Sequence, residues 1–450
     1  MKPYRIAFFP LVRVQFDVPL AEEKISQARK SLTDAGFKLV GPEKPISDLD
    51  SARAAATALQ HVPFDLAVVF QATFADSTMA VSLAETLDES LFLWAIPEEW
   101  TGGRLRLNSL CGINLAGHAL TLRNRHFNYA YADPGDTATI ERIRILAAAG
   151  ALDRALKSAR LGVVGESPAG MDSCLLDEAG LARVFGVKIE KIELQEVFTR
   201  TQNTPQPTIS SVESTLSKIA DNLSTLEQSP LQKTLSAYAV LKEIAQERDL
   251  SGLAVRCWPE FFTQMGCAAC GALSLLSGGF DGNEPIPCSC EADINGTVTQ
   301  FILQTLSGDS AFGTDMVGAD FENDTVALWH CGMAPINMAD PTYPISGGIH
   351  SNRKVPLIMD FRLKPGKVTV LRISQSGGAL RMILGSGEIL PSPKPFSGSA
   401  GTIRFSCSAR DFVDLLMREG LEHHISLTYG DYRAEIEAFA SLANISVTRF

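Results

Sequence analysis

Acidic side chains that could hold a metal ion or move protons follow two short apolar runs in the second half of the chain. Glu260 comes directly after the run Leu253–Trp258, and Glu291 and Asp293 come directly after the run Ile286–Cys290. In an open α/β sheet, ligands bind beyond the carboxyl ends of the strands. Carboxylates at two such ends therefore predict one site for a divalent cation or for an acid and base pair.

Imidazole groups add to this candidate site. His330 follows a third apolar run, Thr325–Trp329, which we expect to be another strand leading to the same site. Further candidates are His350, His423 and His424, although a single histidine is more often a structural hydrogen-bonding residue than a ligand. His424 is favoured because it begins a predicted strand, in which its neighbour His423 points to the opposite face.

Glu260 and Asp293 are the carboxylates that we expect to carry the chemistry. Hard cations such as Mn²⁺ or Mg²⁺ take oxygen ligands with an occasional imidazole. Two carboxylates and one histidine would leave positions open for the adjacent oxygens of a polyol. Arg353 could hold an anionic or polyhydroxyl group through its planar guanidinium. An equally good interpretation is that Arg353 lies in a solvent-exposed basic turn and binds no ligand.

The cysteines offer a rival site. The nine cysteines of the chain are expected to be reduced thiols, since no signal peptide and no disulfide framework can be recognised. Cys267, Cys270, Cys288 and Cys290 would satisfy the count of a tetrahedral zinc site, as in a zinc-stapled oxidoreductase. Cys267 and Cys270 lie in an Ala- and Leu-rich helical pattern, however, which favours simple burial of both thiols.

Composition limits the classes of function. The chain of 450 residues is 45% hydrophobic and 20% charged, with a net charge of −11, and it has no basic stripe of the kind that binds nucleic acid. No apolar run approaches the length of about 18 to 20 residues that a membrane span needs. We therefore expect a cytoplasmic globular protein with a small-molecule or protein partner.

The chain is predicted to contain three domains, two of them α/β domains with doubly wound parallel sheets. Their boundaries are 1–160 and 161–344, and the acidic site lies in the second domain. The third, 345–450, is predicted to be a small antiparallel, β-rich and barrel-like domain, because its strands are closely spaced and few helices separate them. The strands expected in the first domain are Arg5–Phe9, Phe37–Val40, Asp65–Phe70 and Leu91–Ile96.

Several segments resemble the L-fucose isomerase / L-arabinose isomerase superfamily, and the fucose isomerase side of it in particular. They are WPEFF, CEADINGTVTQFILQTLSG, WHCG, HSNRK and GLEHHISLTYGDYRAEIEAFASLANISV. The resemblance is best from about Arg256 onward. It implies a Mn²⁺ site, with Mg²⁺ or Co²⁺ as alternatives, formed by Glu260, Asp293 and His424. The chain is much shorter than typical fucose isomerases, which leaves the sugar open.

The implied reaction is aldose–ketose isomerisation of a monosaccharide through a cis-enediol, with Glu260 and Asp293 as base and acid in undecided order. A sugar-binding or sensing protein without turnover is the alternative. The resemblance also implies a homo-oligomer, a trimer or hexamer, in which Gln71, Thr73, Trp100 and His118 of one subunit meet the substrate of another. The predicted substrate-binding residues are Arg353, Asn352, His350, Glu291, Trp100 and His118.

Overall fold

The computed structural model describes residues 3–87 and 90–450, which form two compact units. The first unit is Met1–Arg154 and the second is Ala155–Phe450. Among the described residues, no helix is both long and apolar enough to cross a membrane.

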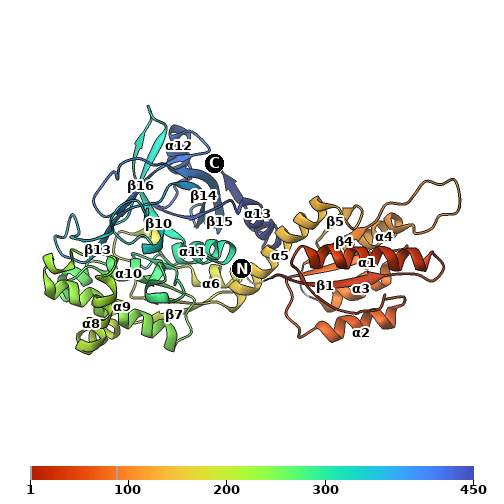
Figure 1. The fold of residues 1–450 in the computed structure, drawn as a ribbon, viewed down its shortest axis with the longest axis horizontal. Coiled ribbons are helices and arrows are strands. Elements are labelled where there is room, and N and C mark those ends of the chain that lie inside the picture. The colour runs from red at the N-terminus through yellow and green to blue at the C-terminus, as the bar shows by residue number, and fades with distance from the viewer. Residues whose placement is uncertain (1–2, 88–89) are drawn as a thin grey trace. The chain divides into compact units, whose positions relative to one another are not determined.

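The first unit is a doubly wound α/β domain with five parallel strands in the order β2-β1-β3-β4-β5 (Figure 1). The strands are β1 (Arg5–Leu11), β2 (Lys38–Val40), β3 (Leu66–Gln71), β4 (Leu91–Ala95) and β5 (Phe127–Tyr131). The helices are α1 (Val18–Asp34), α2 (Leu49–Leu59), α3 (Ser77–Thr86), α4 (Ser109–Thr121) and α5 (Thr137–Ser158).

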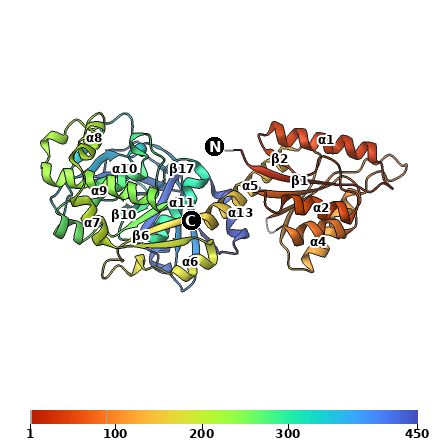
Figure 2. The same ribbon diagram turned by 90° about the horizontal axis from the view of Figure 1, so that it is seen from below.

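Burial on both faces explains why the strands of this sheet read as continuous apolar runs. Ile6 and Phe8 of β1 pack on the side of α1 and α5, whereas Ala7 and Phe9 pack on the side of α2, α3 and α4. In Figures 1 and 2, α1 and α2 lie on opposite sides of the sheet. Helix α1 begins where the Asp17 side chain accepts a hydrogen bond from the amide of Leu20 (3.2 Å).

The second unit contains a parallel sheet of four strands in the order β7-β6-β8-β9. These strands are β6 (Arg160–Val164), β7 (Lys188–Ile192), β8 (Gly252–Val255) and β9 (Cys288–Ser289). The helices of this part are α6 (Glu178–Phe185), α7 (Leu194–Gln202), α8 (Gln206–Leu216), α9 (Gln228–Glu247), α10 (Ala269–Ser277) and α11 (Ile294–Ser307). Helix α11 starts directly after the acidic loop that follows β9, so its first turn faces the candidate site.

An antiparallel barrel of six strands completes the second unit, in the order β16-β11-β10-β17-β14-β15, and pairing of β15 with β16 closes it. Its strands are β10 (Phe312–Asp320), β11 (Thr325–Trp329), β14 (Gly366–Ser374), β15 (Arg381–Ile389), β16 (Ser399–Phe405) and β17 (His424–Tyr429). The peripheral elements are β12 (Ser346–Gly348), β13 (Ile358–Arg362), β18 (Val447–Arg449), α12 (Ala409–Glu419) and α13 (Arg433–Leu442). The prediction of two parallel-sheet α/β domains and a β-rich barrel is confirmed.

One strand lies in a different sheet from the predicted one. The run Thr325–Trp329 is β11 of the barrel, where it pairs antiparallel with β10 and β16, and is not a strand of the parallel sheet. A short turn, 321–324, joins β10 to β11, and a connection of this length allows only antiparallel pairing. The barrel therefore takes its first two strands from the region 161–344 that we expected to be wholly α/β.

Candidate active site

Side chains from the parallel sheet and from the barrel meet where β17 begins. Glu291 and Asp293 lie in the loop between β9 and α11, and Asp315 lies on β10 directly opposite His424 of β17. His330 follows β11, and its ring stacks on that of His424 with centroids 5.2 Å apart. We call the following residues the His424 cluster: Cys174, Glu291, Asp293, Asp315, His330, His423 and His424.

Asp293 is buried and all of its hydrogen-bonding capacity is in use. It caps the N-terminus of α11 by accepting the amide of Gly296 (3.0 Å), and it accepts two hydrogen bonds from Arg372, of 2.6 and 3.1 Å. A Cβ on Gly296 would lie 2.6 Å from one carboxylate oxygen, so glycine permits this close approach. Burial works to raise the pKa of Asp293, but the charge of Arg372 and the hydrogen bond with His424 hold it well below its usual range.

His424 is oriented by the Asp293 carboxylate. Its Nδ1 lies 3.0 Å from Oδ2 of Asp293, whereas its Nε2 lies 3.3 Å from Asp315 and 4.0 Å from Glu291. Burial works to lower the pKa of His424, but the hydrogen bond with Asp293 and the nearby carboxylate of Asp315 raise it well above the usual value. The surrounding carboxylates thus favour a positive charge at Nε2, which a proton or a metal cation can supply.

Glu291 connects the cluster to its surroundings. Its carboxylate accepts a hydrogen bond from Trp258 Nε1 (3.1 Å) and lies 3.0 Å from Nε2 of His423, whose Nδ1 contacts the Ser173 hydroxyl at 3.0 Å. Burial works to raise the pKa of Glu291, but His423 and His424 keep it below its ordinary value. Glu291 and Ala292 both have positive φ values, 58° and 54°, a strained conformation that is typical of functional sites.

Two overlapping groups of possible metal ligands share His424. One contains Cys174, Glu291, His423 and His424, the other contains Asp315, His330 and His424, and within each group the ligand atoms lie within 4.8 Å of one another. Among the described residues, several ligand atoms of the second group are buried and have no hydrogen-bond partner. They are Nε2 of His424, Oδ1 of Asp315 and both ring nitrogens of His330.

Two family models and several curated proteins match this chain. Residues 9–146 match the family model of the fucose/sulfoquinovose isomerase N-terminal domain, and residues 329–450 match that of the L-fucose isomerase C-terminal domain. Proteins named sulfoquinovose isomerase from Priestia aryabhattai and Priestia megaterium are each 30% identical over 447 residues, which is 99% of both chains. One from Alkalicoccus urumqiensis is 30% identical over 444 residues, 98% of both chains.

The chain belongs to the fucose isomerase-like family. It is an enzyme of the aldose–ketose sugar isomerase class, and its match to the sulfoquinovose isomerases extends over nearly the whole length of both chains. The family resemblance noted from the sequence is confirmed. The alternative of a sugar-binding protein without turnover has no support from these relatives.

Within this isomerase, Glu260 lies in a different environment from Asp293 and His424. Both of its carboxylate oxygens accept hydrogen bonds from Arg256 at 2.7 Å, and these bonds keep the pKa of Glu260 below its usual value. Arg256 also donates to the carbonyl oxygen of Glu166 (3.2 Å). The structure thus brings together Asp293 and His424 of the predicted metal set, and it places Glu260 in an ion pair on the adjoining segment.

The predicted substrate-binding segment around Arg353 lies beside this ion-paired segment. His350 is buried, and its Nδ1 accepts the backbone amides of Asn352 and Arg353 at 3.3 Å each. The Asn352 side chain is exposed. The Arg353 guanidinium lies over the rings of Trp258 and Phe262, at 5.8 and 5.6 Å from their centroids.

Trp100 and His118 belong to the first unit. Trp100 is 98% exposed, in the loop between β4 and α4, and the side chain of His118 on α4 is exposed as well. Their predicted contact with a substrate bound to a neighbouring subunit stays a prediction.

The expectation that all cysteines are free thiols is wrong. Cys257 follows β8 and Cys290 follows β9, and because these strands are neighbours the two Cα atoms lie 5.7 Å apart and the sulfurs form a disulfide. Cys290 is therefore not a free thiolate, and the alternative of a tetra-cysteine zinc site is not formed. Cys267 is a buried thiol whose pKa is raised to about 12 by burial.

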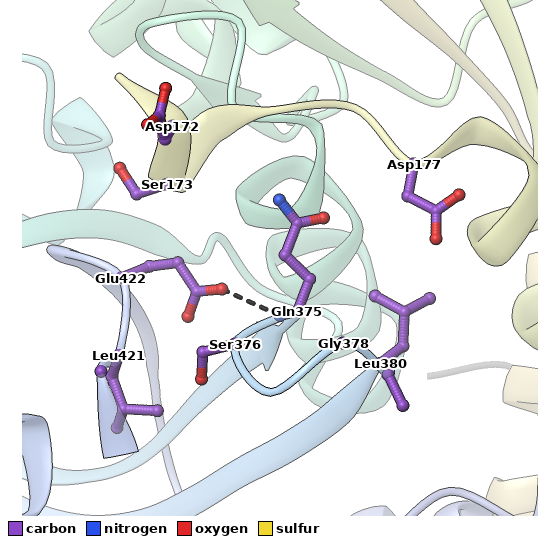
Figure 3. A pocket seen from close by; sticks show the side chains of 11 residues that line it. Asp172, Ser173, Asp177, Gln375, Ser376, Gly378, Leu380, Leu421 and Glu422 are labelled. Carbon is purple, nitrogen blue, oxygen red and sulfur yellow. Dashed lines mark hydrogen bonds between the residues drawn. The ribbon is translucent and has the colours of Figure 1, made fainter. Parts of the chain in front are cut away.

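An open pocket of about 510 Å³ adjoins the His424 cluster through Ser173 (Figure 3). Gln375 and Glu422 lie at its centre, and the backbone amide of Gln375 donates to Glu422 (2.9 Å). Asp172 and Asp177 line it from the loop that follows β6. Because Ser173 also contacts His423, this acidic pocket borders the candidate active site.

The sequence reading missed three residues of the site. Arg372 is a charged residue in the otherwise uncharged, buried segment VTVLRIS of β14, and a charge in a buried strand is a detectable signal. Asp315 lies on β10, which also contains Asp320 and is exposed in its second half, so its charge gives no such signal. Cys174 lies in the short helix Asp172–Cys174, in a loop where no spacing or pattern points to the site.

Proposed function

We propose that this enzyme is a Mn²⁺-dependent isomerase of sulfoquinovose, the glucose derivative with a sulfonate in place of the 6-hydroxyl group, which it converts to the corresponding ketose. Mg²⁺ and Co²⁺ are alternative cations. The relatives named sulfoquinovose isomerase support the sugar, since they match over 98 to 99% of both chains. The observation that carries the proposal is the concentration of carboxylates and imidazoles around His424, with unpartnered ligand atoms at its centre.

The residues present fit a hard divalent cation. Nε2 of His424 and Oδ1 of Asp315 are buried and lie 3.3 Å apart, but neither forms a well-aligned hydrogen bond within the described part of the chain, and Glu291 faces the same space. Imidazole and carboxylate oxygen are suitable ligands for Mn²⁺. Glu291, His424 and Asp315 would hold the ion, while Asp293, whose oxygens are already occupied, would orient His424.

The bound cation would polarise the sugar carbonyl and offset the negative charge that develops during proton transfer. We assign to Glu291 the removal of the proton from C2 of the aldose and its return to C1, which passes through an enediol. We assign the movement of the hydroxyl protons to His423, which contacts both Glu291 and Ser173. Glu260 remains a candidate for the second carboxylate.

Replacing Glu291 with glutamine tests the assigned base. The amide keeps the shape and the oxygen of the side chain but cannot take up a proton, so we expect kcat to fall by roughly 10² to 10⁴-fold while the protein remains folded. Glu260→Gln and Asp293→Asn, assayed in parallel, compare the three carboxylates. Bound metal is measured on each variant, and the exposed Glu388→Gln variant is the control. A Glu291→Gln variant that retains its metal and turns over at the wild-type rate would rule out this role.

A panel of sugars tests the reaction itself. The Mn²⁺-loaded enzyme is incubated with sulfoquinovose, 6-deoxyglucose, L-fucose and L-arabinose, and each product is analysed by NMR for ketose. We expect ketose from sulfoquinovose at the highest rate. Formation of ketose from the neutral sugars alone would contradict the proposed substrate, and its absence with every sugar would contradict the reaction.

A homo-oligomer is part of the proposal. The first unit exposes several large apolar side chains, and four of them line one hollow that we call the Trp100 patch: Trp100, Leu105, Leu110 and Tyr131. Exposed apolar surface of this kind is typical of interaction sites. We propose that the Trp100 patch contacts a neighbouring subunit of a trimer or hexamer.

Charge placed in the Trp100 patch is expected to dissociate the assembly. We expect the Leu110→Glu/Tyr131→Glu variant to be a smaller species by light scattering, to keep its circular dichroism spectrum and to lose turnover. Met417→Glu, at an exposed apolar residue of α12, is the control. An active monomer would show that the active site is complete within one chain.

A further inference from the structure

We infer that Arg353 binds the anionic group at C6 of the substrate and thereby makes the enzyme selective for a sulfonated sugar. This inference rests on the proposed function, because it concerns the far end of the same substrate. A sulfonate carries three oxygens on a tetrahedral sulfur and has a fixed negative charge at neutral pH. A guanidinium group, which is always protonated and offers several N–H donors in one plane, matches such a group.

Arg353 differs from Arg256 and Arg372, two other arginines of this region. Arg256 is neutralised by Glu260 and Arg372 by Asp293, each through two hydrogen bonds. In residues 3–87 and 90–450, by contrast, no carboxylate forms an ion pair with the exposed guanidinium of Arg353 and no side-chain hydrogen bond uses its donors. Its positive charge and its donors are therefore available to a ligand.

Aromatic rings hold this guanidinium next to the cluster. It lies over Trp258 and Phe262, at 5.8 and 5.6 Å from the ring centroids, and such contacts orient a cation without using its N–H donors. Trp258 also donates its indole N–H to Glu291 (3.1 Å). One indole ring thus separates the free cation from the carboxylate to which we assign proton transfer at C1 and C2.

A sugar that contacts both Glu291 and Arg353 must extend past the ring of Trp258, which each of these two residues contacts. A chain of six carbons with bonds of about 1.5 Å spans roughly 6 Å from C1 to C6, and a charge-assisted hydrogen bond adds about 3 Å at its end. The inference places the carbonyl end of the sugar at Glu291 and its sulfonate beside Arg353. The backbone supports this position, since the amide of Arg353 donates to the buried His350 (3.3 Å).

The experiment compares two sugars that differ only at C6. The Mn²⁺-loaded wild type, Arg353→Ala and Arg353→Lys are titrated by calorimetry with sulfoquinovose and with 6-deoxyglucose, which has hydrogen in place of the sulfonate. We expect Arg353→Ala to bind sulfoquinovose about 10- to 100-fold more weakly, as the loss of hydrogen bonds to a charged group implies, and to bind 6-deoxyglucose as the wild type does. Arg353→Lys should recover part of the preference.

Two control variants test whether the effect is specific to the positive charge at Arg353. Lys354→Asn removes the adjacent positive charge and tolerates the positive φ of that residue (59°), and Arg410→Ala removes an arginine that lies over Phe321 on another surface. Both should keep the wild-type preference. If Arg353→Ala still prefers sulfoquinovose, or if the wild type does not distinguish the two sugars, the inference is wrong. Ketose formation, measured separately, decides whether the proposed reaction holds, so the two failures can be told apart.

Discussion

Replacing His424 with alanine is expected to abolish isomerisation and to weaken Mn²⁺ binding by more than the roughly 10- to 100-fold that the loss of an outer-shell partner costs. The reason is that His424 belongs to both groups of possible ligands and directs its Nε2 between Glu291 and Asp315. The measurements are kcat/KM and the Mn²⁺ content of the purified variant. His61→Ala, at an exposed histidine of the first unit, is the control.

Chelation should reproduce the effect of this substitution in the wild type. Because the ligands come from β17, β10 and the loop after β9, the ion can bind only the folded protein and should stabilise it by linkage. We expect a chelator to lower Tm and to remove activity, and we expect Mn²⁺ to restore both. Full activity of the wild type after exhaustive chelation would contradict a metal-dependent mechanism.

The second large effect is expected for stability. Arg372 and Asp293 form a bidentate ion pair with side chains only 2% and 1% exposed, so Arg372→Met would leave a buried carboxylate without its strongest partner. Breaking a buried pair in this way costs about 3 to 5 kcal/mol of the free energy of unfolding. Arg433→Ala breaks the exposed bidentate pair with Asp431 and should cost less than about 1 kcal/mol. Denaturant unfolding measures both.

The loss of unfolding free energy in Arg372→Met should depend on pH. In the wild type, the pKa of Asp293 is lowered on folding, so its contribution to stability is present above the unfolded pKa of about 3.9 and is lost as pH falls further. In Arg372→Met, the charge of Arg372 no longer offsets burial, so the pKa of Asp293 is higher than in the wild type. Acidification then protonates Asp293 and removes the free-energy cost of burying its unpaired charge. The two unfolding free energies should converge as pH falls. An Arg372→Met variant as stable as the wild type at neutral pH would contradict a structural role for the pair.

Much of the fold could be predicted because local patterns agree with the final topology. The apolar run at β1 and the helical spacing of α1 lead directly to a parallel sheet, and the closely spaced strands after β13 lead to an antiparallel barrel. The assignment of β11 was wrong because an apolar run does not specify its partner strand. Its partners are fixed by the short turn from β10 and by pairing with β16, which is distant in sequence.

The sequence predicts which acids lie near one another, but it does not predict their different environments. The sequence predicts Glu291 and Asp293 directly after a strand, and the structure has this strand. The local sequence does not show, however, which of the two carboxylates is held by other residues and which is available. What separates them is that Arg372, 79 residues away, and the first turn of α11 occupy the oxygens of Asp293, while Glu291 stays available beside His423. Such partners come from the closure of the barrel against the parallel sheet, and no local pattern encodes them.

The metal site is tested most directly by a pulsed electron paramagnetic resonance measurement on the Mn²⁺-loaded enzyme, because it detects nitrogen ligands of the ion itself. We expect a ¹⁴N coupling from a directly bound imidazole in the wild type and in the His61→Ala control. We expect this coupling to be lost in His424→Ala and retained in Glu260→Gln. A wild-type spectrum without nitrogen coupling, or a coupling unchanged in His424→Ala, would contradict the assignment of the His424 cluster as the metal site of this isomerase.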